Sequence, residues 1–131
     1  WHINDDYKKN NYNSILICPQ STDIDRNLNS ELLDKLIEDL KKEDNSYRIT
    51  IASSNLSDYR DGCNQFLFNK TYESSLEFLK LIKKNDLIVC VDSAPLHLGM
   101  ALKKNLVVFL RSTIPEIVIN TGATLKIKNF Q

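Results

Sequence analysis

The stretch from Asp86 to Leu110 constrains the fold of this chain more than any other part of the sequence. It holds two apolar runs, Leu87 to Val91 and Leu106 to Leu110, each too short for a stable helix and rich in β-branched residues. Because neither run alternates between apolar and polar residues, both are predicted to be strands buried on two faces. About a dozen residues separate them, which is room for one crossover helix between parallel strands. The stretch is therefore predicted to form a β-α-β unit.

The predicted crossover helix begins directly after the first of these strands. Asp92 or Ser93 can cap its first turn, and Pro95 lies where a missing N–H costs no hydrogen bond. Its apolar face is expected to consist of Leu98, Met100, Ala101 and Leu102. Ligands of open parallel sheets bind at the carboxyl ends of the strands. The junction that holds Asp92, Ser93 and His97 is therefore the first candidate for a functional site.

The rest of the sequence alternates between short apolar runs and helical patterns. Further strands are expected at Ser14 to Cys18, Arg48 to Ala52, Phe66 to Phe68 and Thr124 to Lys128. Helices are expected from Ser30 to Lys42 and from Thr71 or Ser74 to Asn85. The second of these helices is expected to turn Leu76, Leu79 and Ile82 towards the core. This alternation predicts the α/β class, as a three-layer, Rossmann-like, doubly wound parallel sheet. Residues 14–131 are expected to form this single domain, and the polar residues 1–13 a tail or interdomain linker.

Composition narrows the classes of partner. Seventeen Lys and Arg residues balance seventeen Asp and Glu residues, so no net field favours nucleic acid or an anionic membrane. Three cysteines make no disulfide framework, and Cys18 and Cys90 are predicted to be buried thiols in a reducing compartment. No apolar run has membrane-spanning length, and no stretch resembles a signal peptide. The sequence does not begin with Met, which is consistent with a piece of a longer protein.

A phosphate group would need a site without a glycine-rich loop, because the three glycines form no such motif. A helix N-terminus offers free N–H groups and a positive dipole end, and the turn from Ser93 to His97 provides one. Ala94 keeps the approach open, since a larger side chain would crowd a diphosphate. The alternative is that Asp92 and Ser93 only cap the helix, and that His97 is a packed residue. We do not expect His97 to be a catalytic base.

The same residues resemble a known family. A strand ending in Asp-Ser-Ala-Pro-Leu-His-Leu, followed by a helix of small residues and another buried strand, resembles the C-terminal half of the bacterial heptosyltransferases. Those enzymes belong to glycosyltransferase family 9 and have the GT-B architecture. Their pattern is roughly Asp-Ser/Thr-Gly-x-x-His, in which Ala94 replaces the glycine in this chain, and Arg111-Ser112-Thr113 stands where the family usually has Gly-Pro-Thr. The resemblance runs from about Ile15 to Leu110.

The resemblance implies the donor-binding domain of an inverting glycosyltransferase. Ser21 and Thr22 fall where the family binds the donor phosphates, and Arg26 falls where it usually has Lys. A fixed cation and hydroxyl donors would stabilise a diphosphate leaving group, so Arg26 is the candidate catalytic residue. The candidate substrate-binding residues are Ser21, Thr22, Asp58, Asp92, Ser93, Ala94 and His97. Asp58 follows the second strand, where an acidic residue often binds a ribose hydroxyl. The alternatives are a surface Asp58, and a solvated loop in which Arg26 pairs with Asp23 or Asp25.

The resemblance also implies the partners. The donor would be a nucleotide-diphospho-sugar, with ADP-heptose as the first choice, used for lipopolysaccharide or another surface glycan. The general base would be an aspartate of an N-terminal acceptor-binding half that is missing from this chain. The location would be the cytoplasm, where the protein could work at the inner face of the inner membrane, with membrane contact through that other half alone. No cofactor and no divalent metal are expected.

Two other interpretations compete with this one. A phosphoacceptor receiver domain also has an aspartate at the end of a buried strand, but its acidic pair should follow the first strand, where Cys18-Pro19-Gln20 stands. A non-catalytic nucleotide-binding or protein-interaction module descended from the donor domain remains open, because Ala94, Arg26 and Arg111-Ser112-Thr113 all depart from the family pattern.

Overall fold

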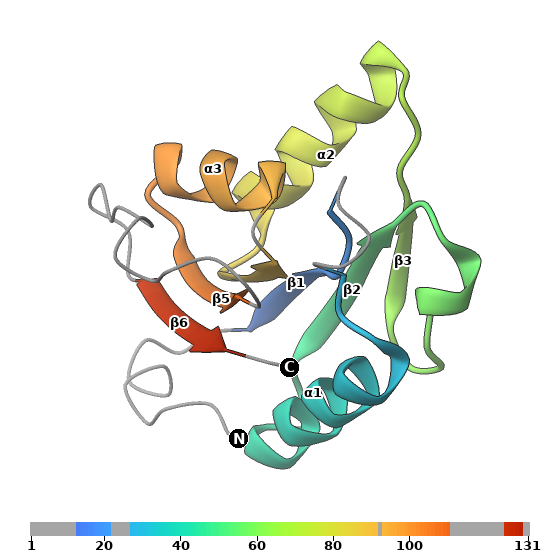
Figure 1. The fold of residues 1–131 in the computed structure, drawn as a ribbon, viewed down its shortest axis with the longest axis vertical. Coiled ribbons are helices and arrows are strands. Elements are labelled where there is room, and N and C mark those ends of the chain that lie inside the picture. Colours follow the sequence, from blue (N-terminus) through green and yellow to red (C-terminus); the bar gives the residue numbers. More distant parts are fainter. Residues whose placement is uncertain (1–12, 22–26, 92, 111–124, 130–131) are drawn as a thin grey trace.

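The computed structural model describes residues 13–21, 27–91, 93–110 and 125–129. In this part of the chain, six strands form one sheet in which every neighbouring pair is parallel, in the order β3-β2-β1-β4-β5-β6 (Figure 1). The strands are β1 Ser14–Cys18, β2 Arg48–Ser53, β3 Asn64–Leu67, β4 Leu87–Val91, β5 Asn105–Leu110 and β6 Leu125–Asn129. This is the strand order of the doubly wound dinucleotide-binding fold, so the predicted fold class is confirmed.

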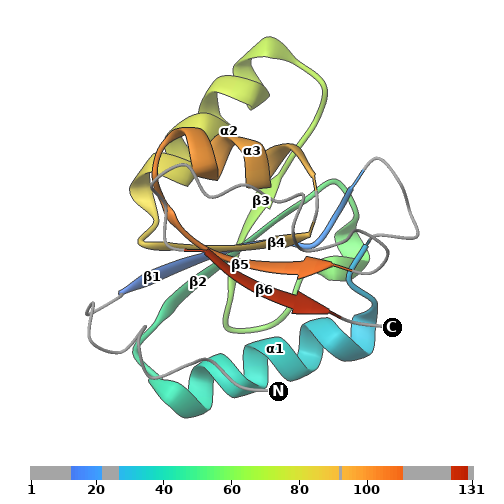
Figure 2. The same cartoon turned by 60° about the vertical axis from the view of Figure 1, so that its left-hand side comes forward.

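Helices cover both faces of the sheet. Helix α1, Ser30–Glu43, lies on one face, whereas α2, Tyr72–Lys84, and α3, Ala94–Ala101, lie on the other (Figure 2). A short 3₁₀ helix, η3, Leu56–Asp58, follows β2. None of the described helices is long and apolar enough to cross a lipid bilayer. The three-layer arrangement explains why the inner strands are continuously apolar, since each of their two faces is covered.

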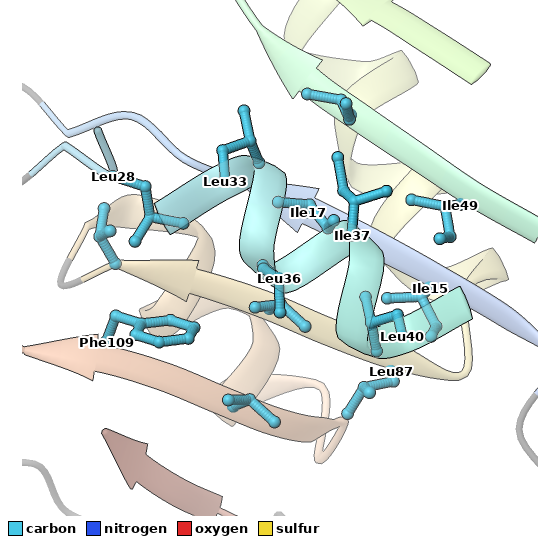
Figure 3. Packing of buried hydrophobic residues seen from close by; sticks show 14 residues of the cluster. Ile15, Ile17, Leu28, Leu33, Leu36, Ile37, Leu40, Ile49, Leu87 and Phe109 are labelled. Atoms are coloured by element: carbon cyan, nitrogen blue, oxygen red, sulfur yellow. The ribbon is translucent and has the colours of Figure 1, made fainter. Parts of the chain in front are cut away.

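The central strands divide their side chains between two hydrophobic clusters. Ile15 and Ile17 of β1 pack with α1, and Leu16 and Cys18 pack with α2 and α3. The face of α1 that meets the sheet consists of Leu33, Leu36, Ile37 and Leu40, all buried (Figure 3). Because successive side chains of a strand point to opposite faces, each cluster receives every second residue of β1 and β4.

Helix α2 is rotated relative to the prediction from its leucines. It buries Ser74, Phe78 and Ile82, whereas Leu76 is 39% exposed and Leu79 is half-buried. The Phe78 ring packs at 6.0 Å from Phe66 and 5.4 Å from Phe68, centroid to centroid. The aromatic side chains in and directly after the short edge strand β3 therefore select which stripe of α2 faces the sheet, and a leucine count alone does not detect them.

Helix α3 also buries a different face from the one predicted. Its buried residues are Pro95, Leu96, Gly99 and Met100. Of the predicted face, Met100 is buried, Leu98 and Leu102 are half-buried and Ala101 is exposed. A short helix that is apolar around most of its circumference has no periodic signal to identify the inner face. Gly99 allows the close approach, because a Cβ atom there would lie 2.7 Å from Cδ2 of Leu106 on β5.

The amino ends of the two central strands are joined by one carboxylate. Oδ2 of Asp86 accepts from the backbone N–H of Asn13 at 2.8 Å and of Ser14 at 3.2 Å, and the Asp86 N–H donates to the carbonyl oxygen of Ser14 at 3.0 Å. The hydrogen bond from Asn13 lowers the pKa of Asp86, with partial burial acting in the opposite direction. This joint fixes the register in which Cys18 lies opposite Cys90 at the other end of the strands. Burial and the neighbouring Cys90 raise the pKa of Cys18, and both thiols are buried as predicted.

Candidate functional site at the carboxyl ends of β1 and β4

The candidate site lies where the order of the strands reverses. β1 and β4 are neighbours, but the chain leaves β1 towards α1 and β2, and leaves β4 towards α3 and β5. The two connections therefore run in opposite directions from adjacent strand ends, on opposite faces of the sheet (Figure 2). In doubly wound folds this point is the crevice that binds ligands. The residues that follow Cys18 and Val91 consequently share one edge of the sheet.

The first turn of α3 supplies one wall of this site. Ser93 is the N-cap residue, but its hydroxyl donates to the Val91 carbonyl at 3.0 Å and makes no capping bond to the helix. Ala94 and His97 are exposed, so His97 is not packed in the core. The Ser93 side chain therefore does not occupy the helix N-terminus. Pro95 has no N–H and the Leu96 N–H donates to the Ser93 carbonyl oxygen at 3.1 Å, so an anion there would bind the remaining N–H groups of the first turn. Asp92, the other predicted cap, lies outside the described residues.

The loop after β1 lies at the adjacent strand end. Its two ends are joined by a backbone bond from the Leu28 N–H to the Pro19 carbonyl, at 2.9 Å. A second bond runs from the Ser21 N–H to Oδ1 of Asn27, at 2.7 Å. Ser21 is half-buried at this edge of the sheet, next to the end of β1. Thr22 and Arg26, the other residues predicted in this loop, lie between these ends and outside the described residues.

Asp58 is at the same edge, in the loop after β2. Its Oδ2 accepts from the hydroxyl of Ser53 at 2.6 Å, and the Tyr59 hydroxyl donates to the Ser53 carbonyl at 2.6 Å. Burial and the neighbouring Asp58 raise the pKa of Tyr59. One carboxylate oxygen of Asp58 therefore holds its own loop, and the predicted contact with a ribose stays a prediction. Since β2 adjoins β1 and not β4, Asp58 is farther from the reversal point than Ser21 and Ser93.

Residues that the sequence did not single out fix the loops around the site. Arg60 donates from Nε to Asp34 at 2.5 Å and from Nη2 to the Ser30 hydroxyl at 2.9 Å, which joins the β2 loop to the start of α1. Gln20 accepts from Ser54 and joins the β1 loop to the β2 loop. Asn27, which closes the β1 loop, was also missed. Asn27 lies close enough in sequence to suggest a loop closure, whereas the Arg60 and Gln20 contacts leave no local signal.

Those predicted site residues that the structure describes thus lie at the same edge of the sheet, the one formed by the carboxyl ends of the strands. Ser21, Ser93, Ala94 and His97 follow two adjacent parallel strands, and Asp58 follows the next strand outward. Within the described residues, side chains of His, Cys, Asp and Glu form no group of three that could hold a metal ion. The arrangement combines backbone N–H groups, hydroxyls and a small side chain at a helix start, which is chemistry suited to a phosphate group.

Comparisons with known proteins show the family and the fold of this chain. The sequence model described as glycosyltransferase family 9 (heptosyltransferase) matches residues 2–126. Among solved structures, a family 9 glycosyl transferase from Veillonella parvula DSM 2008 matches with a TM-score of 0.70 at 12% sequence identity. The match covers 96% of this chain and 38% of that chain, so this chain spans well under half of that protein's length. At such low identity the likeness shows the fold alone. The comparison with curated proteins gives no match.

Proposed function

Because this chain belongs to glycosyltransferase family 9, we propose that residues 14–131 are the donor-binding half of an inverting, heptosyltransferase-like glycosyltransferase. The observation that supports this most directly is the meeting of two loops at the reversal of strand order. The Ser21 loop follows β1 and the Ser93 turn follows β4, and their strands are hydrogen-bonded neighbours. This is the place where the doubly wound fold holds the phosphates of a nucleotide.

The proposed donor site is built around the diphosphate. The N-terminus of α3 receives one phosphate group, with Ala94 leaving space for it and Ser93 beside it. Ser21 and Thr22 donate hydrogen bonds from the opposite loop, and Asp92 and His97 border the nucleotide. Helix N-termini stabilise anions by about 0.3–1 kcal/mol at exposed positions and by up to about 2 kcal/mol in partly buried ones.

The chemistry assigned to this half is the stabilisation of the leaving group. In the transfer, the bond between the anomeric carbon of the sugar and the diphosphate oxygen breaks, while an acceptor hydroxyl attacks from the opposite face. Negative charge then grows on the diphosphate, and Arg26 is the fixed cation that compensates it. The proton of the acceptor hydroxyl goes to a base on the acceptor-binding half. Arginine offers two parallel N–H donors to phosphate oxygens where lysine offers a point charge.

Donor, acceptor and location follow from the family in the same proposal. ADP-heptose is the first donor to test, and the acceptor belongs to lipopolysaccharide or another surface glycan. An acceptor-binding N-terminal half completes the enzyme, and the reaction takes place in the cytoplasm. Contact with a membrane is assigned to that other half.

Titration with ADP tests the donor site. The chain is expected to bind ADP with a dissociation constant on the order of hundreds of micromolar, because a partial set of contacts holds the ligand. Ala94→Leu should weaken binding at least about tenfold, because its side chain enters the space of the phosphate. The measurement is the dissociation constant by calorimetry or NMR titration.

Ala101→Leu is the matched control, because Ala101 is also exposed and lies at the other end of the same helix. Its affinity for ADP should equal that of the wild type. If Ala94→Leu and Ala101→Leu bind ADP with the same affinity, a phosphate site at the start of α3 is contradicted. Failure of the wild type to bind any nucleoside diphosphate would leave the descended, non-catalytic interaction module as the better description.

Arg26→Ala is the second substitution that is expected to lower the affinity for ADP. Removing a charge-assisted hydrogen bond costs roughly 1.5–3 kcal/mol, so ADP affinity should fall about ten- to a hundredfold. The loss should shrink as salt is raised, since ions screen the attraction between the guanidinium and the diphosphate. Arg48→Ala, which removes an exposed arginine at the opposite, amino end of β2, is the control. Indifference of ADP binding to Arg26→Ala would mean that the loop only connects β1 to α1.

A further inference from the structure

The side chain of Gln20 spans the carboxyl ends of two strands. It follows β1 and lies half-buried at the edge of the sheet that carries the candidate site. Its Oε1 accepts from the backbone N–H of Ser54 at 2.7 Å and from the Ser54 hydroxyl at 3.0 Å. Ser54 directly follows β2, which pairs with β1. Gln20 therefore closes the space between the β1 loop and the β2 loop.

The partners of Gln20 determine which way its amide is turned. The Ser54 N–H can only donate, so the oxygen of the Gln20 amide must face it. Both acceptor positions of that oxygen are then used by Ser54. The amide nitrogen is directed away from Ser54 and has two N–H donors, for which no described residue supplies an acceptor. A donor pair is thus held at the rim of the site.

The loop after β2, which carries Ser54, is itself held by several hydrogen bonds. The Ser53 hydroxyl donates to Asp58 and accepts from the Asn55 N–H at 3.0 Å. Tyr59 and Arg60 add hydrogen bonds from the same loop to β2 and to α1. Ser54 consequently has a fixed position, and Gln20 loses little further freedom when its nitrogen binds a ligand. Such preorganisation lets one hydrogen bond contribute measurably to affinity.

The position of this amide corresponds to a particular part of a nucleotide. The proposed function assigns the phosphates to the reversal between β1 and β4, and the strand order places β2 on the far side of β1. In doubly wound folds the ribose lies beside the end of β2, where an acidic side chain usually accepts from a ribose hydroxyl. In this chain Asp58 already accepts from Ser53, and Gln20 covers the end of β2 from the neighbouring loop.

We propose that Nε2 of Gln20 donates a hydrogen bond to a ribose hydroxyl of the donor nucleotide and makes the site selective for ribonucleotides. This rests on the proposed function, because it assigns the ribose of the same donor. Gln20 is a specificity-determining residue in this proposal and takes no part in the chemical step.

The test compares ADP with 2′,3′-dideoxy-ADP. Both carry the same diphosphate, so a change of charge at the protein affects both affinities equally and cancels in their ratio. The wild type should bind ADP about five- to tenfold more tightly, as expected for one neutral hydrogen bond. In Gln20→Ala the amide donor is gone and no carboxylate replaces it as an acceptor for a ribose hydroxyl, so the ratio should fall to about one.

The side-chain amide of Gln20 provides a direct signal. Its N–H₂ pair, assigned by its disappearance in Gln20→Glu, should shift in NMR spectra when ADP is added and should stay in place when inorganic pyrophosphate is added. Gln65→Ala is the control variant, because Gln65 is an exposed glutamine two residues before the carboxyl end of β3, and its affinity ratio should match the wild type.

Each contrary result has a distinct meaning. If the wild type binds ADP but Gln20→Ala keeps the full ratio, Gln20 only connects the two loops and the inference is wrong. A shift of the Gln20 amide with pyrophosphate alone would assign it to phosphate and would also overturn the inference. In both cases the proposed function stands, because ADP still binds. Failure of the wild type to bind ADP would overturn the proposed function together with this inference.

Discussion

When the 131-residue chain is supplied with ADP-heptose and candidate acceptors, no measurable sugar transfer is expected. The proposed donor site can hold the diphosphate and compensate its charge, but transfer also needs the acceptor hydroxyl and its base in line with the anomeric carbon. Holding two reactants in that geometry contributes roughly 7–11 kcal/mol to catalysis. In the proposed arrangement that contribution comes from an acceptor-binding half, and this chain covers 38% of the similar family 9 structure.

The measurement is product formation with the chain alone, with a separately produced N-terminal half alone, and with both together. Turnover with both together, and with neither alone, is the expected pattern. The Arg26→Ala chain mixed with the same half serves as the control, since it should lower turnover without preventing the two halves from meeting. Turnover by the chain alone would refute the division of labour between two halves.

Leu36→Ala is expected to lower the free energy of unfolding by about 3 kcal/mol. Leu36 is 2% exposed and lies in the cluster between α1 and the central strands, so its truncation leaves a cavity that the sheet cannot fill (Figure 3). Domains of this size are stable by about 5–15 kcal/mol, so the loss is a large fraction of the total. Urea denaturation should show a lower midpoint with an unchanged slope.

Leu76→Ala is the matched control for this substitution. It is the same change in a helix on the other face, but Leu76 is 39% exposed and lies outside the buried stripe of α2. Its effect should be within about 0.5 kcal/mol. Equal losses at Leu36 and Leu76 would mean that these two leucines are buried to a similar extent in solution.

The strands were predictable because burial on both faces leaves a strong local pattern. Every expected strand in the described part of the chain is found, with ends within two residues of the prediction. The inner faces of α2 and α3 were not predictable in the same way. Phe78 faces the sheet because Phe66 and Phe68 lie opposite, and α3 has no polar stripe to mark its outer face. Both depend on partners that are distant in sequence.

The candidate site was predictable to the extent that it follows from strand ends. Ser21 and Ser93 share an edge because parallel strands have their carboxyl ends on the same side. The hydrogen bonds that connect the loops at this edge were not predictable. Gln20 contacts a residue 34 positions away, and Arg60 contacts a residue 26 positions away. Side-chain hydrogen bonds of this range leave no periodic trace in a sequence. The predicted roles of Thr22, Arg26 and Asp92 stay predictions, because these residues lie outside the described part of the chain.

The pairing of β1 with β4 has a consequence for folding during synthesis on the ribosome. These two strands form the centre of the sheet, yet Ser14 and Asp86, which join them, are 72 positions apart. At a synthesis rate of roughly 5–20 residues per second, β1 waits for about 4–14 seconds before its second neighbour is made. During that interval one edge of a strand whose residues are all buried in the folded protein has no partner, and pairing between distant segments is slow in any case. For several seconds the nascent chain therefore exposes an unpaired strand edge that can aggregate with other chains. A chaperone would have to shield this edge during that time.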